Sequence, residues 1–283
     1  MRIGNAQFDT ENEVYIMGIL NVTPDSFSDG GRFESPDAAL FQTEKMLKEG
    51  ASIIDVGGES TRPGSRSVSA QEEMERVVPV IRAIRERFDT VISLDTCKPA
   101  VAAEGLKAGA ELINDIAGLR YEDDTTMAAV IAGAGAACVI MHNTGRADMR
   151  GGVQDVKTSE EKSSVTDSVI SELGISLRIA EKAGIRKDGI IIDPGIGFGK
   201  DTRQNLELIA NADRLQELGY PVLMAASRKT VIGQVLDLDV SERLEGTIAV
   251  TTASVLKGCA FIRVHDVKEN YRAAKMALAL RKA

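Results

Sequence analysis

The sequence has no tryptophan, only two histidines and only three cysteines in 283 residues. Two histidines are too few for a histidine-based zinc site. The cysteines Cys97, Cys138 and Cys259 are scattered, and no Cys-x-x-Cys pair occurs, which argues against a disulfide framework or a cysteine zinc site. A nucleophilic thiol at Cys97 would need a histidine partner, and neither histidine is a sequence neighbour.

Basic residues are also in the minority, with 34 Lys and Arg against 42 Asp and Glu, a net charge of −8. Nucleic acids and anionic membranes require a basic face, so we expect neither as a partner. No apolar run approaches the roughly 20 residues of a membrane span. Residues 1–13 are polar and acidic, unlike a secretory signal. We therefore expect a cytoplasmic protein.

Short apolar runs recur along the chain, and each stops at a polar side chain. The polar residues that end or follow these runs are Asn21, Asp55, Asp95, Asn114, His142, Asp193, Ser227 and His265. Continuous apolar strands are typical of a parallel sheet that is buried on both faces. Eight strand-then-helix units predict a (β/α)8 TIM barrel, a single domain over 1–283 with a short N-terminal extension. An open doubly wound sheet is the alternative.

Helix signals separate the strands. Residues 69–72 match a capping box, and Pro79 is expected to bend the helix that follows. A further helix is expected over 204–218. In such a barrel the side chains at the carboxyl ends of the strands gather round one mouth.

Three sets of residues at this mouth suggest chemistry. The loops 21–31 and 57–66 are long and polar, and the second has the glycines, hydroxyls and Arg62 of an anion cradle. Asp95, Asn114 and Asp193 can pair with a ligand that carries adjacent N–H donors. Each of these could instead cap the helix after it.

Cations complete the mouth. Lys229 follows strand seven, and Arg263 and His265, two residues apart on strand eight, can reach one anion. Any metal should be a hard cation such as Mg²⁺, bound by oxygen and phosphate.

Together these segments resemble the dihydropteroate synthase family of folate biosynthesis. The matching blocks are residues 17–31, 55–64, 95–96 with 98–99, 113–115, 193–200, 227–229 and 263–267. The resemblance implies a transferase that joins p-aminobenzoate to a dihydropterin pyrophosphate with release of pyrophosphate, that needs Mg²⁺ and that is a target of sulfonamides. It also implies a homodimer that pairs through helices opposite the mouth.

The same resemblance implies the role of each site residue. Asn21 would bind Mg²⁺ and pyrophosphate, with further pyrophosphate contacts from Thr61, Arg62, Arg263 and His265. The pterin-binding residues would be Asp95, Asn114, Met141, Asp193 and Lys229. Pro63, Phe198, Ser227 and Lys229 would form the p-aminobenzoate slot. We assign catalysis to Asp95, Asp193, Lys229 and Arg263, in a dissociative substitution at the pterin methylene.

Two departures from the family pattern and two alternatives remain. Asn143-Thr144 follows Met141-His142 where the family usually continues with Met, and Thr230 replaces a commoner Ser. A pterin-dependent methyltransferase domain would have no use for the anion-binding residues. A non-catalytic pterin-binding paralogue is expected to lose Asp95, Asp193, Lys229 or Arg263, and all four are present.

Overall fold

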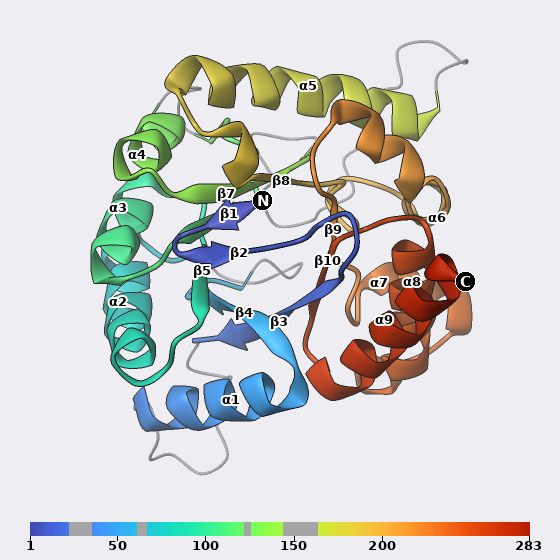
Figure 1. The fold of residues 1–283 in the computed structure, drawn as a ribbon, viewed down its shortest axis with the longest axis horizontal. Helices are drawn as coiled ribbons and strands as arrows, with labels where there is room; N and C mark the ends of the chain where they lie inside the picture. The colour runs from blue at the N-terminus through green and yellow to red at the C-terminus, as the bar shows by residue number, and fades with distance from the viewer. Residues whose placement is uncertain (23–35, 61–66, 122–125, 144–163) are drawn as a thin grey trace.

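Eight parallel strands form one sheet that curls into a barrel, and helices cover its outside (Figure 1). The computed structural model describes residues 1–22, 36–60, 67–121, 126–143 and 164–283. A bridge between Ile192 and Val222 joins β8 to the segment before β9 and closes the sheet. The (β/α)8 barrel is therefore confirmed, and the open sheet is wrong.

The strands follow one another round the barrel in the order β8-β7-β6-β5-β4-β3-β10-β9. They are β3 (Tyr15–Asn21), β4 (Ala51–Gly57), β5 (Val91–Asp95), β6 (Leu112–Asp115), β7 (Ala137–Met141), β8 (Ile190–Asp193), β9 (Leu223–Met224) and β10 (Phe261–Val264). One predicted strand end is wrong, because β4 continues past Asp55 to Gly57. Asp55 therefore lies inside the barrel wall instead of on its rim.

Helices pack around the strands. They are α1 (Pro36–Glu49), α2 (Ala70–Arg87), α3 (Pro99–Ala108), α4 (Thr126–Ala134), α5 (Val165–Ala183), α6 (Thr202–Ala210), α7 (Thr230–Leu236), α8 (Leu244–Leu256) and α9 (Val267–Lys282). Ser69 caps α2 by accepting the Glu72 N–H at 3.1 Å, as predicted, and the helix runs through Pro79 without interruption. The sequence patterns did not predict the short helix α7.

The expected helix over 204–218 is wrong as a single element. α6 begins at a capping box between Asp201 and Gln204, and it ends at Asn211. The Asn211 side chain donates to the Glu207 carbonyl at 2.9 Å, and its backbone leaves the helical region with ψ of 27°. The Asn211 backbone N–H donates to the same carbonyl at 3.0 Å, so Asn211 is the C-cap of α6. The chain continues as a 3₁₀ helix, η3 (Ala212–Leu218).

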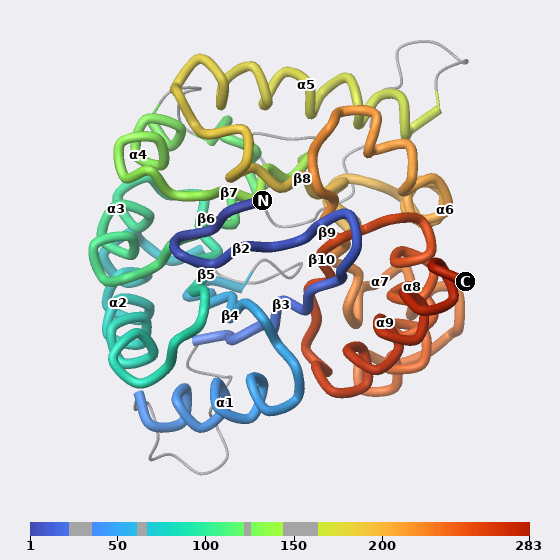
Figure 2. The backbone as a smooth tube through the Cα atoms, viewed as in Figure 1, coloured from blue at the N-terminus to red at the C-terminus, as the bar shows by residue number. Residues whose placement is uncertain are grey.

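The amino end of the barrel is closed by a hairpin of β1 (Arg2–Ile3) and β2 (Ala6–Gln7), which crosses the barrel in Figures 1 and 2. Ile3 and Phe8 are buried against the inward side chains of the strands. Phe8, Tyr15 and Phe261 also form an aromatic cluster, with ring centroids 4.8–5.7 Å apart. This apolar plug leaves the carboxyl end of the barrel as the place for a ligand.

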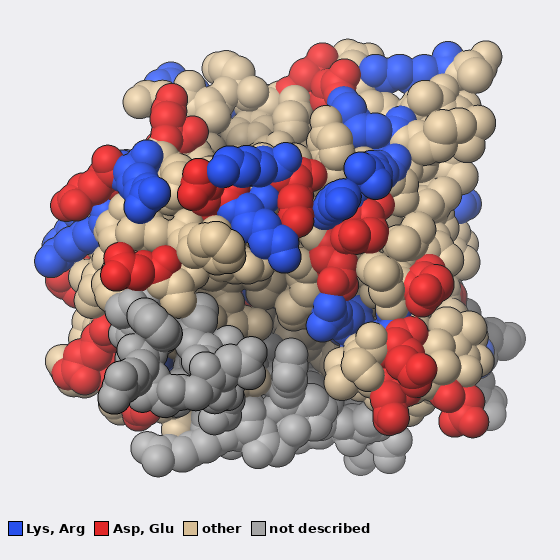
Figure 3. Space-filling view, turned by 90° about the horizontal axis from the view of Figure 1, so that it is seen from below, with Lys and Arg blue, Asp and Glu red and all other residues tan. Residues whose placement is uncertain are grey.

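The outer surface carries charges of both signs. Figure 3 shows positive and negative side chains interspersed over the described part of one face. Within the described ranges, no helix has the length and apolarity that crossing a membrane requires.

Candidate active site

The strand register brings polar side chains together at the carboxyl end of the barrel. Asn21 of β3 is paired with Gly57 of β4, Gly57 with Asp95 of β5, and Asp95 with Asn114 of β6. A Cβ atom on Gly57 would lie 3.8 Å from Asn21 Oδ1 and 3.9 Å from Asp95 Oδ2, so the glycine leaves room between these two side chains. Three of the predicted site residues thus line up across four consecutive strands, with Gly57 of β4 between Asn21 and Asp95.

Arg263 of β10 joins this row from inside the barrel. Its Nε donates to Asp55 Oδ2 at 2.6 Å, and its Nη2 donates to Asp95 Oδ2 at 2.5 Å. The Asn114 amide nitrogen also donates to Asp55 Oδ2, at 3.1 Å. One partly buried guanidinium therefore lies between two carboxylates, one of which also binds the neighbouring amide.

Burial dominates the electrostatics of this cluster. It raises the pKa of Asp95 to about 7, although the Arg263 guanidinium acts in the opposite direction. Burial alone would lower the pKa of Arg263, but the Asp55 and Asp95 carboxylates outweigh it and raise that pKa. Arg263 is therefore always charged, whereas Asp95 titrates near neutral pH.

Asp193 and Lys229 bring opposite charges near each other at the mouth. Asp193 ends β8 beside Met141 of β7, and its Oδ1 accepts the Gly195 N–H at 2.7 Å. Burial raises the pKa of Asp193, and the positive charge of Lys229 moderates that rise. Burial lowers the pKa of Lys229 to about 8, with Asp193 acting against it. The opposed charges thus stabilise each other out of water.

Lys229 also contacts the turn after β8. Its Nζ donates to the Ile196 carbonyl at 2.5 Å and lies 4.8 Å from the centroid of the Phe198 ring. Lys200, a buried residue of the same turn, donates to the carbonyls of Gly195 at 2.9 Å and Phe198 at 3.0 Å. The turn that carries Phe198 is therefore fixed by two lysines.

An apolar wall adjoins these charges. Met141 and Phe198, two of the apolar residues predicted for the site, belong to one buried cluster with Cys97, Ile116 and Ala117. Such a surface suits the face of a flat ring, while the acidic and amide groups suit its polar edge.

Ser227 and His265 meet at the other side of the mouth. Ser227 Oγ lies 3.0 Å from His265 Nδ1, and it accepts the backbone N–H of His265 at 3.2 Å. Arg263 and His265 thus have different partners, and their joint contact with one anion stays a prediction. Ser227 is followed by Arg228, whose φ of 56° is left-handed and whose guanidinium binds Asp266 with both of its forked nitrogens.

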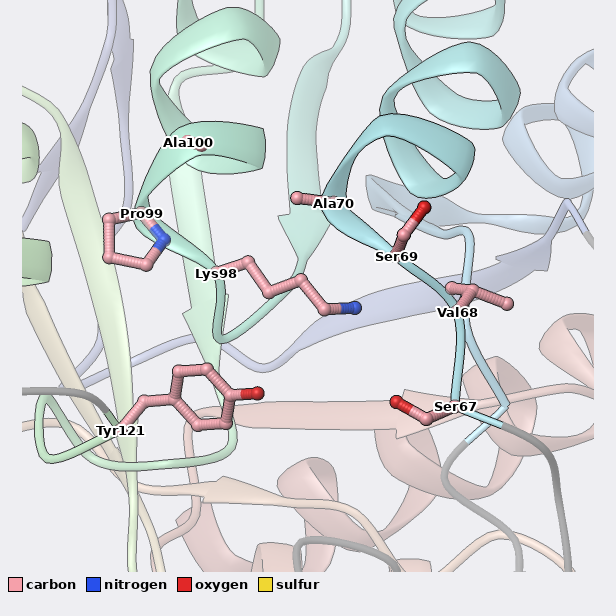
Figure 4. A pocket seen from close by; sticks show the side chains of 8 residues that line it. All are labelled: Ser67, Val68, Ser69, Ala70, Lys98, Pro99, Ala100 and Tyr121. Carbon is pink, nitrogen blue, oxygen red and sulfur yellow. The ribbon is translucent and has the colours of Figure 1, made fainter.

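A cavity of about 320 Å³ opens beside the mouth, between the first turns of α2 and α3 (Figure 4). Lys98 and Tyr121 line it, but the Lys98 ammonium forms ion pairs with Glu59, at 2.5 Å, and Glu73. The charge of Lys98 is therefore already neutralised by these two carboxylates, so Lys98 gives no reason to expect an anion in the cavity.

Asn21 is the candidate metal ligand. Over the residues that the structure describes, no group of three or more His, Cys, Asp and Glu side chains could hold a metal ion. An amide oxygen such as Asn21 Oδ1 is a suitable hard ligand for Mg²⁺, which keeps several waters and takes other ligands from substrate phosphates. The donor set at the mouth therefore fits a metal that arrives with a phosphorylated substrate.

The structure describes ten of the thirteen predicted site residues and places them at one end of the barrel. Thr61, Arg62 and Pro63, most of the predicted loops 21–31 and 57–66, and residues 144–158 after β7 lie outside the described residues. Sequence reasoning missed Asp55 and Lys200. The spacing of Asp55 could have predicted its place in the site. Asp55 lies two residues from both Ile53 and Gly57, which puts it on the inward face of β4.

The cysteines take no part in this chemistry. All three are buried, and burial raises the pKa of each thiol. Cys97 therefore stays protonated at neutral pH and is a poor nucleophile.

Comparisons with known proteins show the family of the chain. Residues 17–265 match the family model described as pterin binding enzyme. The dihydropteroate synthase of Clostridium beijerinckii is 48% identical over 98% of this chain and 97% of its own. A Clostridium difficile dihydropteroate synthase, crystallised in the presence of pteroic acid, superposes with a TM-score of 0.88 at 44% identity over 97% of this chain and 99% of its own. The Yersinia pestis enzyme in complex with a sulfonamide drug superposes with a TM-score of 0.89 at 38% identity, over 100% of this chain and 99% of its own.

Proposed function

We infer the activity from family membership, because this chain belongs to the pterin-binding enzymes and, among them, to the dihydropteroate synthases. It joins p-aminobenzoate to 6-hydroxymethyl-7,8-dihydropterin pyrophosphate, giving 7,8-dihydropteroate and pyrophosphate. The observation that carries this conclusion is the meeting of Asp95, Asn114, Asp193 and Lys229, from three strand ends and the N-cap of α7, at one mouth.

The charges of these residues suit a pterin. Its aminopyrimidinone edge presents adjacent N–H donors, which the Asp193 carboxylate can accept side by side. Asn114 offers one donor and one acceptor, and Lys229 can donate to a ring carbonyl. The side chain of Met141 lies in the neighbouring apolar wall, where the ring face would pack.

The remaining groups suit departure of pyrophosphate. As the C–O bond at the pterin methylene breaks, negative charge grows on the leaving group and positive charge on the methylene. Arg263 and His265 would stabilise the negative charge on the leaving group. The carboxylates of Asp95 and Asp193 would stabilise the positive charge on the methylene. Asn21 would hold Mg²⁺, which when bound neutralises pyrophosphate charge. Of the residues outside the structure, Thr61 and Arg62 would add anion contacts.

The p-aminobenzoate slot would lie beside Lys229. The Phe198 ring lies beside the Lys229 ammonium in space, Ser227 precedes the lysine by two residues in sequence, and Pro63 would complete the slot. The amine of p-aminobenzoate would attack the methylene directly, so the step needs no nucleophile from the protein. The slot is also where a sulfonamide, which mimics p-aminobenzoate, would compete.

The protein would act in the cytoplasm as a homodimer. Support for the dimer comes from the flank formed by α6 to α9, which lie together in Figure 1. Large apolar side chains are exposed there, as follows: Leu206, Val235, Leu236, Leu256, Met276 and Leu280. Contiguous exposed apolar surface commonly marks a protein interface. Light scattering coupled to size-exclusion chromatography tests this, and a monomeric mass at micromolar concentration would reject it.

Turnover is tested by following pyrophosphate release from the purified protein with Mg²⁺ and both substrates. We expect release that depends on p-aminobenzoate and on the pterin pyrophosphate, with dihydropteroate as the second product. Pterin binding without release would identify a non-catalytic paralogue. Methyl transfer from methyltetrahydrofolate to a corrinoid would identify the methyltransferase class.

A further inference from the structure

Asp55 has the contacts of a residue that acts through its neighbours. It is fully buried in β4, two residues before the strand ends. Its Oδ2 accepts from Asn114 at 3.1 Å and from Arg263 at 2.6 Å. Its Oδ1 has no hydrogen-bond partner among the described residues. The hydrogen bonds that the structure gives Asp55 therefore go to two site residues, and none of them caps a helix or closes a turn.

We propose that Asp55 is a positioning residue of the pterin site, which fixes the orientation of the Asn114 amide. This inference rests on the proposed function. A carboxylate can only accept, so it must face the NH₂ group of Asn114 and not its carbonyl. One N–H is thereby engaged, and the other N–H and Oδ1 remain for a ligand. A flipped amide would exchange donor and acceptor, and the pterin edge would meet the wrong group.

Arg263 holds Asp55 in this role. A buried carboxylate is costly unless it is paired, and the Arg263 guanidinium supplies the pair at 2.6 Å. Arg263 is itself held by Asp95 at 2.5 Å, so it keeps one carboxylate partner if Asp55 is removed. The Asn114 amide nitrogen has Asp55 as its one hydrogen-bond acceptor within the described part of the chain. Loss of Asp55 should therefore disturb Asn114 more than Arg263.

Asp115 provides a matched control on the adjacent strand. It is also fully buried, and burial raises its pKa to about 6. Its oxygens accept the backbone N–H groups of Ala117 at 2.9 Å and Leu119 at 2.7 Å, so it shapes a turn. Substitution of Asp115 should lower stability without changing which way Asn114 faces.

The experiment measures binding of 6-hydroxymethylpterin and of pyrophosphate with Mg²⁺, by calorimetry, and unfolding by urea. The variants are Asp55→Ala, Asp55→Asn and Asp115→Asn. We expect Asp55→Ala to weaken pterin binding roughly tenfold or more, as removal of an orienting residue commonly does. Pyrophosphate binding should not weaken in parallel. Asp55→Asn should restore most of the pterin affinity, since its oxygen can take the Oδ2 position, and Asp115→Asn should alter stability alone.

A double-variant cycle isolates the proposed route. If Asp55 acts through Asn114, Asp55→Ala should change pterin affinity little in an Asn114→Ala background. Equal losses in both backgrounds, or parallel losses of pterin and pyrophosphate binding, would overturn the proposal. If Asp55→Ala fails to fold, Asp55→Asn provides the test. A loss of pterin affinity for Asp55→Asn as large as that for Asn114→Ala would overturn the proposal. Failure of the wild type to bind pterin would instead reject the proposed function.

Discussion

Replacement of Arg263 by methionine should destabilise the fold in a pH-dependent way. The guanidinium lies between Asp55 and Asp95, and methionine would leave both carboxylates buried without a counter-charge. Breaking a buried pair by removing one partner costs about 3–5 kcal/mol. We expect the free energy of unfolding to fall by that amount at pH 8, where both carboxylates would have to stay ionised.

The loss should shrink in acid. Burial already holds the folded-state pKa of Asp95 above its unfolded value of about 3.9, and loss of Arg263 would raise it further, so stability is lost as the pH rises from the unfolded value toward the folded pKa. At pH 5, protonation of one such carboxyl costs only about 1.5 kcal/mol, because pH 5 is about one unit above the unfolded pKa and each unit corresponds to about 1.4 kcal/mol. The penalty at pH 5 should therefore be about a third to a half of that at pH 8.

Urea unfolding of the wild type and of Arg263→Met at pH 5 and pH 8 measures this difference. Arg263→Lys is the matched control, because it keeps the charge but cannot bind both carboxylates with a planar fork. Its loss should be smaller and less dependent on pH. An equal loss for Arg263→Met at both pH values would refute the electrostatic reasoning.

Other predictions concern binding and turnover. Asp193→Asn should weaken pterin binding at least a hundredfold, measured by calorimetry. The substitution replaces one acceptor of the carboxylate by a mismatched donor, and each hydrogen bond to a charged group contributes about 1.5–3 kcal/mol. Unchanged affinity would remove Asp193 from the site. Pterin affinity of the free enzyme should rise through about pH 7, as Asp95 ionises, and fall through about pH 8, as Lys229 loses its proton; a flat profile from pH 6 to 9 would contradict this. Lys200→Met should raise the KM for p-aminobenzoate more than that for the pterin substrate, because Lys200 fixes the turn that carries Phe198; equal changes in steady-state kinetics would count against it.

The barrel was predictable because its strands are buried on both faces. Runs such as Ile190–Asp193 are apolar up to the barrel mouth, where a polar side chain can contribute to a ligand site. Strand ends at one edge of a parallel sheet meet in space, so Asp95 and Asn114 could be placed together without coordinates, and their register confirms it.

Contacts inside the barrel were harder to predict. The apolar run before Asp55 suggested a strand that ended there, whereas β4 continues to Gly57 through pairing with β3 and β5. The ion pair of Arg263 with Asp55 joins residues 208 positions apart, and no local pattern encodes it. The break at Asn211 likewise falls where the sequence has neither glycine nor proline. Tertiary contacts decided the first two of these points.

A crystal structure with bound pteroic acid is the most direct test of the central claim, that residues from separate strands form one pterin site. We predict that the pterin edge is hydrogen-bonded to Asp193 and Asn114, with its ring against Met141 and the benzoate toward Lys229 and Phe198. Pteroic acid bound elsewhere, such as in the cavity beside Tyr121, with the barrel mouth unliganded, would contradict the claim.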